Sequence, residues 1–308
     1  MTALLGDPVL TRAWVGVSAL LVLGTLLSWL FHRRRASPET CKTLLRVRTW
    51  WLIVACLFVA MSLGPPGLAG LFCLVTLAAL GEFVNLDKRA PRRGIVWTVL
   101  ALGAVTVYAL LALHSALIRS WPAWSALLFM MGTALVAATG STRRGLLSLG
   151  AFLLGACGLA CVVGLSQVGA DRSAACTGIR LVFVLLLLTG LNDIAQYLWG
   201  KGLGRRPVVP HISPRKTWAG FVGGVITTAF LAAALAPSFT AEGRQWGLLT
   251  GLLIGVGGFA GDILASAYKR RVGACESGTL LPGHGGIIDR IDSLCVTAPL
   301  LYCAVRFS

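Results

Sequence analysis

Ten apolar segments follow one another along the 308-residue chain, and no polar stretch between them is long enough to form a soluble domain. An apolar run of about 20 residues can cross the hydrocarbon core of a bilayer as a helix. Only 12% of the residues are charged, whereas soluble domains usually carry about 25%. The sequence therefore predicts an all-α integral membrane protein, a polytopic bundle of about 9–10 transmembrane helices.

Two of the ten segments are shorter than the others. The second ends at Pro65-Pro66, which indicates a tight turn, and the last begins with charged residues. A count of nine spans therefore stays open as an alternative to ten. The predicted segments are residues 8–31, 49–63, 67–86, 95–117, 123–139, 146–168, 178–199, 217–237, 246–268 and 288–306.

Basic residues alternate between successive loops. Loops one, three, five, seven and nine hold 20 of the 27 Lys and Arg residues, and the even-numbered loops hold 3. Because short cytoplasmic loops are enriched in Lys and Arg, we expect the odd loops to face the cytoplasm and the N-terminus to face outward. The same rule explains the net charge of +16, so we expect no nucleic acid partner. It also places the polar segments 200–216 and 269–287 on one side of the membrane.

Acidic residues are rare, eleven in all, and five in the second half of the chain fall at or near the expected cytoplasmic face: Asp193, Asp262, Glu276, Asp289 and Asp292. An ionised Asp inside a membrane costs roughly 2.5–3.5 kcal/mol without a partner. Asp193 and Asp262 lie inside predicted spans, which favours a cation or a water-filled cavity between them. Asp289 and Asp292 are spaced to share one helix face near a helix N-terminus. Simple capping and salt bridges are the alternative for this pair, whereas clustered carboxylates suit Mg²⁺.

Glycines and basic residues surround these acids. The stretch Pro282-Gly283-His284-Gly285-Gly286 directly precedes the helix expected to carry Asp289. Glycines let backbone N–H groups converge on an anion, although a tight turn between helices explains the stretch equally well. Arg215 and Lys216 follow Ser213-Pro214, and Lys269 and Arg270 lie on the Asp262 face of one predicted helix. These cations either bind phosphates or serve only as topology charges.

The residues from Ser266 to Asp292 resemble the signature of the phosphatidate cytidylyltransferases, also called CDP-diacylglycerol synthases. That pattern runs S-x-x-K-R, four residues, K-D, and then GHGG-x-x-DR-x-D. Residues 192–202 resemble the family's AD-x-x-A-Y-x-x-G-K stretch, and 213–220 resemble its SP-x-KTW-x-G element. The likeness covers about residues 190–308. Cys275-Glu276 stands where the family has Lys-Asp, which is typical of a divergent paralogue with altered rate or substrate.

The resemblance implies a CTP-dependent cytidylyltransferase that converts a lipid phosphate (phosphatidate) and CTP to a CDP-lipid (CDP-diacylglycerol) and pyrophosphate. It implies that Asp289, Asp292 and Glu276 hold Mg²⁺, at two cation sites, with Asp262 and Asp193 as further ligands or supporting residues. The residues expected to bind the substrates are Ser213, Arg215, Lys216, Lys269, Arg270, His284, Gly285 and Gly286.

We expect N-terminal transmembrane helices in residues 1–177 and a catalytic transmembrane region in 178–308, within one continuous membrane domain. The expected location is the bacterial inner (plasma) membrane, with the active site facing the cytoplasm and lipid as the surrounding partner; the sequence leaves a homodimer open. Three alternatives remain. A CTP-using lipid kinase of the polyprenol type would release CDP instead of pyrophosphate, a transporter would release neither, and a non-catalytic relative would bind without turnover.

Overall fold

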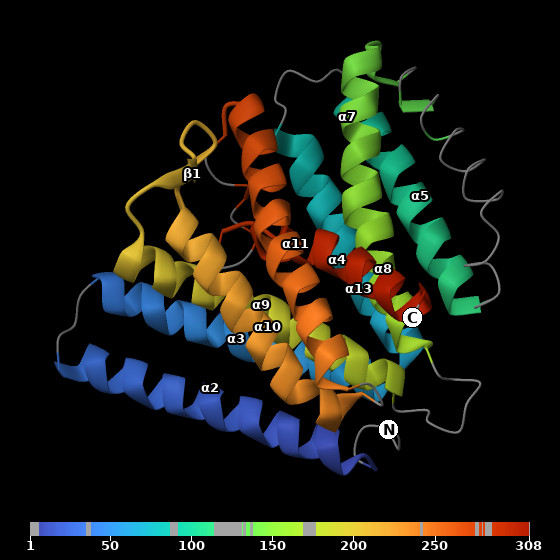
Figure 1. The fold of residues 1–308 in the computed structure, drawn as a ribbon. Coiled ribbons are helices and arrows are strands. Elements are labelled where there is room, and N and C mark those ends of the chain that lie inside the picture. Colours follow the sequence, from blue (N-terminus) through green and yellow to red (C-terminus); the bar gives the residue numbers. More distant parts are fainter. Residues whose placement is uncertain are drawn as a thin grey trace.

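The computed structural model describes residues 6–34, 38–86, 92–113, 131, 134–135, 138–168, 177–240, 243–274, 277–278, 280 and 285–307. Eight helices within these ranges are long and apolar enough to cross a membrane. The protein is therefore an all-α polytopic membrane protein, as the sequence predicts, and Figure 1 shows its helices as one bundle.

The first half of the chain supplies five of the eight spans. Three of its helices begin with a proline, which fits the first turn because its missing N–H has no helical partner there. The fifth span is continuous but contains a π-helical turn. The elements are α2 (Pro8–Arg34), α3 (Pro38–Ser62), α4 (Pro65–Leu86), α5 (Arg93–Leu113), α7 (Thr142–Phe152), the π-turn η2 (Leu153–Cys157) and α8 (Gly158–Ser166).

The second half supplies three long helices and two short ones. Between its first two helices lies a small antiparallel hairpin, which the sequence did not predict. The elements are α9 (Thr177–Leu203), β1 (Pro207–Val209), β2 (Ser213–Thr217), α10 (Trp218–Phe239), α11 (Arg244–Arg271), α12 (Ile288–Ile291) and α13 (Leu294–Phe307).

Eight of the ten predicted segments are confirmed as helices of spanning length. The segment 123–139 lies mostly outside the described residues. The prediction of one span over 288–306 is wrong, because the helix breaks between Ile291 and Leu294. The 14 residues of α13 are too few to cross a bilayer, which takes about 20. The break places Asp292 and Ser293 in a bend instead of along a straight helix.

Small residues allow α11 to lie directly against α10. Gly247, Gly251 and Gly255 recur every four residues and so share one face of α11. A Cβ atom on each would lie 2.6 Å from Ala232 O, 2.6 Å from Ala229 Cα and 2.9 Å from Val225 Cα, respectively. Such close backbone approach is typical of membrane helix pairs with small residues at four-residue spacing. Figure 1 shows α9, α10 and α11 packed beside one another.

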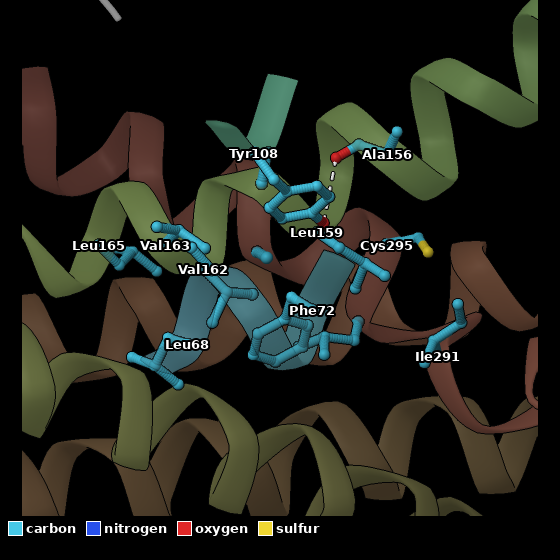
Figure 2. Close-up of a cluster of buried hydrophobic side chains, with 14 of the residues drawn as sticks. Leu68, Phe72, Tyr108, Ala156, Leu159, Val162, Val163, Leu165, Ile291 and Cys295 are labelled. Atoms are coloured by element: carbon cyan, nitrogen blue, oxygen red, sulfur yellow. Dashed lines mark hydrogen bonds between the residues drawn. The ribbon is translucent and has the colours of Figure 1, made fainter. Parts of the chain in front are cut away.

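A second core joins the first half of the chain to the last helices. Leu68 and Phe72 of α4 and Tyr108 of α5 meet the buried face of α8 and the start of α13 (Figure 2). Thr76 Oγ1 lies 2.9 Å from the Tyr108 hydroxyl, which also donates to Ala156 O at 3.5 Å. A buried hydroxyl thus finds partners on two other helices.

An ion pair fixes the start of α9. Arg180 donates from Nε to Asp7 Oδ2 at 2.6 Å and from Nη2 to Asp7 Oδ1 at 2.8 Å. Asp7 is 3% exposed. Burial alone would raise its pKa, but the hydrogen bond from Arg180 and other donors outweigh this effect and hold the pKa below its usual value. The pair lies roughly 20 Å along α9 from Asp193, at the opposite end of the bundle.

Candidate active site

Two acids of the membrane helices meet at one serine. Ser293, in the bend before α13, places its Oγ 3.2 Å from Asp193 Oδ1 on α9 and 3.2 Å from Asp262 Oδ1 on α11. The Gly258 carbonyl oxygen lies 3.3 Å from the same Oγ. A serine hydroxyl has a single proton to donate, so it can satisfy only one of these three acceptors at a time. The two carboxylates therefore share one donor.

Asp292 brings a third carboxylate to this point. Its Oδ1 accepts the Ser293 backbone N–H at 2.9 Å, and its carboxyl group interacts directly with that of Asp262. Three segments of the chain thus contribute one acid each. Like charges at such close range disfavour the simultaneous ionised state of all three unless a cation or a proton balances them.

Lys216 supplies one such cation. It lies at the end of β2, where Thr217 caps α10 by accepting the Gly220 N–H at 3.2 Å. Its Nζ forms an ion pair with Asp262 Oδ2 and donates to Gln196 Oε1 at 3.3 Å. The ammonium also lies 5.7 Å from the centroid of the Phe259 ring, within the range of a cation–π contact. The hairpin and cap therefore place this lysine beside the clustered acids.

Two glycines of α11 make the approach of these segments possible. A Cβ atom on Gly261 would collide with the Asp292 carbonyl oxygen and lie 3.0 Å from Ser293 Cα. A Cβ atom on Gly258 would lie 2.6 Å from Asn192 Nδ2 on α9. Helix α11 thus touches both the bend and α9 with its bare backbone, next to Asp262.

Asp289 has other partners than Asp292. Its Oδ1 pairs with Lys269 Nζ, and its Oδ2 accepts the Ser277 hydroxyl at 2.8 Å and the Ser277 N–H at 3.3 Å. Burial by itself would raise the pKa of Asp289, but the hydrogen bonds from Lys269 and Ser277 outweigh it and leave the pKa below its usual value. The two carboxylates of the expected one-face pair have different neighbours in the structure: Asp289 bonds Lys269 and Ser277, whereas Asp292 lies beside Ser293 and Asp262.

Glu82 of α4 occupies the start of α12, a role that sequence reasoning missed. Its two carboxylate oxygens accept the backbone N–H groups of Ile287 at 3.0 Å and Ile288 at 3.1 Å. A Cβ atom on Gly286 would lie 2.5 Å from Glu82 Oε2, and one on Gly278 would lie 2.5 Å from Glu82 Oε1. The anion at this helix terminus is therefore the protein's own carboxylate, and these two N–H groups are not available to a phosphate.

The other predicted substrate-binding residues lie around the hairpin and before α12. Arg215 and Ser213 belong to β2, and Arg215 is exposed. Arg270 donates to the hairpin carbonyl of Ile212 at 3.3 Å, so it secures the hairpin beside α11. Gly285 adopts a positive φ of 82°, which favours glycine. The predicted substrate-binding residue His284, the predicted metal ligand Glu276 and its neighbour Cys275 lie outside the described residues.

The side chains at the site are chemically suited to Mg²⁺, although they are not arranged in a metal-binding geometry in the described part of the chain. Among the described residues, no group of three His, Cys, Asp or Glu side chains is arranged to hold a metal. The acids that do meet, Asp193, Asp262 and Asp292, offer only hard oxygen donors, which Mg²⁺ prefers. They crowd like charges around Lys216, the cation paired with Asp262. These observations favour the three over Asp289, whose oxygens already have partners.

Sequence reasoning also missed Ser293 and Gln196. Ser293 directly follows Asp292, so its neighbourhood was visible, but its link to Asp193 spans 100 residues. Gln196 lies three residues after Asp193 on α9, close enough to share its surroundings on a helix. For Glu82, the scarcity of acids inside spans was the available signal, since an intramembrane acid usually has a function or a partner.

Comparisons with known proteins identify the family of this chain. The model of the cytidylyltransferase family matches residues 44–308. A protein of Escherichia coli (strain K12) called "uncharacterized protein YnbB" is 38% identical over 309 residues, covering 97% of this chain and 99% of the relative.

Two phosphatidate cytidylyltransferases match a shorter part. That of Brucella suis is 40% identical over 126 residues, or 41% of this chain and 46% of the relative. That of Staphylococcus aureus (strain COL) is 38% identical over 125 residues, or 40% of this chain and 48% of the relative. The chain thus matches about half the length of these enzymes. The resemblance predicted from the residues is confirmed, and this chain belongs to the cytidylyltransferase family of nucleotidyltransferases.

Proposed function

We propose that the protein transfers CMP from CTP to phosphatidate or a related lipid phosphate. A phosphate oxygen of the lipid attacks the α-phosphorus of CTP and forms a new P–O bond. The bond between that phosphorus and the oxygen bridging to the β-phosphate breaks, and pyrophosphate leaves. The products are a CDP-lipid (CDP-diacylglycerol from phosphatidate) and pyrophosphate. The lipid phosphate is already an anion, so the protein needs no Ser or Cys nucleophile.

The observation that carries this proposal is the meeting of Asp193, Asp262, Asp292 and Lys216 at Ser293. Asp193, Lys216 and Asp292 belong to stretches that resemble the family signature, and Asp262 lies four residues before one of them. The four residues come from different elements of the fold. The reaction brings two polyanions together, so its main requirement is positioning and charge neutralisation. Lys216 can neutralise phosphate charge, and Asp193 is exposed at the side of α9, where a lipid head group has access.

We propose that the three carboxylates at Ser293 hold Mg²⁺. When bound there, Mg²⁺ would neutralise phosphate charge and help to orient the reacting groups. Ser293 then keeps Asp193 and Asp262 in place through its hydroxyl, and Asp292 is fixed by the adjacent N–H. Asp289 and Glu276 remain predicted ligands of a second cation.

A CTP assay tests the proposed function. Purified protein in detergent micelles receives labelled CTP, Mg²⁺ and a panel of lipid phosphates that includes phosphatidate. We expect labelled CDP-lipid and an equal amount of pyrophosphate. Release of CDP with transfer of a phosphate to lipid would instead identify a lipid kinase. The absence of CTP consumption with every lipid phosphate would rule out the cytidylyltransferase activity.

The site is proposed to face the cytoplasm of a bacterial inner membrane, on the basis of the alternating loop charges. Exposed His211 of the hairpin and exposed Gly243 at the start of α11 lie at opposite ends of α10. In a variant without native cysteines, a membrane-impermeant maleimide applied to intact spheroplasts should label Gly243→Cys and leave His211→Cys unlabelled. Opening the membrane should expose His211→Cys. The reverse labelling would invert the topology.

A further inference from the structure

Gln196 has a buried side-chain amide in which only one of the two polar atoms has a hydrogen-bond partner. It lies on the α10-facing side of α9 and is 5% exposed. Its Oε1 accepts a hydrogen bond from Lys216 Nζ at 3.3 Å. Its Nε2 is buried and has no hydrogen-bond partner among the described residues. A buried donor without an acceptor is costly and therefore rare in native proteins.

The orientation of this amide is fixed by the lysine. Exchanging the oxygen and nitrogen of Gln196 would point an N–H group at the Lys216 ammonium, which has donors only. The neighbouring amide of Asn192 differs in this respect. Its Nδ2 is also unpartnered, but exchanging its two atoms would let it donate to Thr228 Oγ1, whose own proton has an acceptor at Gly224 O, 2.8 Å away. Of these two described amides, only that of Gln196 keeps an unpartnered N–H in either orientation.

Packing also prevents the side chain from turning away. A Cβ atom on Gly224 of α10 would collide with Gln196 Cγ and lie 3.3 Å from Gln196 Cα. A Cβ atom on Gly220 would lie 2.7 Å from the Gln196 carbonyl oxygen. The side chain therefore fills the space that Gly224 leaves open, and its amide lies beside Lys216, which is paired with Asp262.

We propose that Gln196 binds substrate, donating its free Nε2–H to a phosphate oxygen that Lys216 also contacts. The acceptor must be an oxygen that tolerates a cation beside it, and a phosphate meets both conditions. The inference rests on the proposed function, in which CTP and a lipid phosphate both bring such oxygens to this site. A single amide thereby contributes to the recognition of phosphate. Its oxygen orients Lys216, and its nitrogen donates to the ligand.

Two substitutions separate the oxygen from the nitrogen. Gln196→Met has a similar length but neither donor nor acceptor. Gln196→Glu keeps an acceptor for Lys216 and loses the donor, while adding a charge that repels phosphate. We expect the KM of either CTP or phosphatidate to rise by about tenfold for Gln196→Met and further for Gln196→Glu, with a smaller change in kcat. The substrate whose KM rises identifies the source of the phosphate oxygen.

The matched control is Gln167→Met. Gln167 donates to Leu111 O at 3.0 Å, and its Oε1 is buried without a partner, but it follows α8 and belongs to no part of the site. This variant should leave both KM values unchanged. A wild-type KM for both substrates in Gln196→Glu would overturn the proposal, because that variant has lost the donor and its added charge can only weaken phosphate binding. If Gln196→Met does not fold, the KM values of Gln196→Glu still test the proposal.

A binding measurement keeps the inference separate from the proposed function. If the wild type turns over no lipid phosphate, the proposed function fails. The affinities of wild type and Gln196→Glu for CTP, and for nanodiscs containing phosphatidate, are then compared. Weaker binding of either probe by the variant supports the role of Gln196, and equal binding of both overturns it.

Discussion

Asp292→Asn is expected to lower kcat by at least about 100-fold, which corresponds to about 2.7 kcal/mol of transition-state stabilisation. Asparagine keeps an oxygen that can accept the Ser293 N–H bonded to Asp292 Oδ1, so the bend should keep its shape. The substitution removes one of three negative charges that meet at Ser293, and with it a ligand for the proposed Mg²⁺. Initial rates with CTP and phosphatidate at several Mg²⁺ concentrations measure the effect.

The control for this substitution is Asp7→Asn. Asp7 is also a buried carboxylate, but it pairs with Arg180 at the other end of the bundle. Asp7→Asn should lose thermal stability and keep its kcat. Asp292→Asn should keep its thermal stability and lose kcat. Wild-type turnover in folded Asp292→Asn would show that the carboxylate serves only as a cap for Ser293.

Gly261→Ala should reduce activity even more strongly than it reduces stability. The added methyl group would collide with the Asp292 carbonyl oxygen and lie 2.9 Å from its carbonyl carbon. Backbone cannot move aside as a flexible side chain can, so α11 and the bend must separate. Overpacking of this kind costs about 1–3 kcal/mol of stability. A shift of about 1 Å at a reacting centre can cost roughly 100-fold in rate, and Asp262 is the next residue of α11.

Gly190→Ala is the comparison for Gly261→Ala. No heavy atom lies within 4 Å of a Cβ atom placed on Gly190, and alanine is the better helix former. Melting temperature and turnover should therefore stay at or slightly above wild-type values. Equal turnover in both variants would show that the contact between α11 and the bend does not position the site.

The sequence predicts the spans well because hydropathy is a local property. An apolar run of sufficient length forms a helix in a membrane whatever its neighbours are, since every backbone N–H and C=O group must be satisfied within the segment. The prediction for the last segment fails because of tertiary contacts, which hydropathy does not report. Residues 288–306 are apolar enough for a helix, but Asp292 and Ser293 turn toward acids on α9 and α11, and the helix breaks there.

The grouping of the acids was only partly predictable. Rarity and depth identify Asp193 and Asp262 as residues that need a partner, and the structure brings them together. Helical spacing alone suggested that Asp289 acts together with Asp292, but spacing carries no information about the partners that each carboxylate finds on other segments. Nor does it show that Lys269 and Ser277 satisfy Asp289. Such partners follow from tertiary packing, in this case from the close contact that Gly258 and Gly261 permit.

The bond from Glu82 to the start of α12 affects how chimaeras of this family should be built. Glu82 lies within the residues that the family model matches but outside the signature stretches. Its carboxylate nevertheless fits against Gly278 and Gly286 of the signature region. An exchange point between the two halves would pair α4 of one parent with the segment of the other parent that contains Gly278 and Gly286. Recombinants that inherit both from one parent should assemble, and those that mix them should leave two backbone donors without an acceptor. The workable unit of exchange is thus α4 together with residues 277–292, although about 190 residues separate them in sequence.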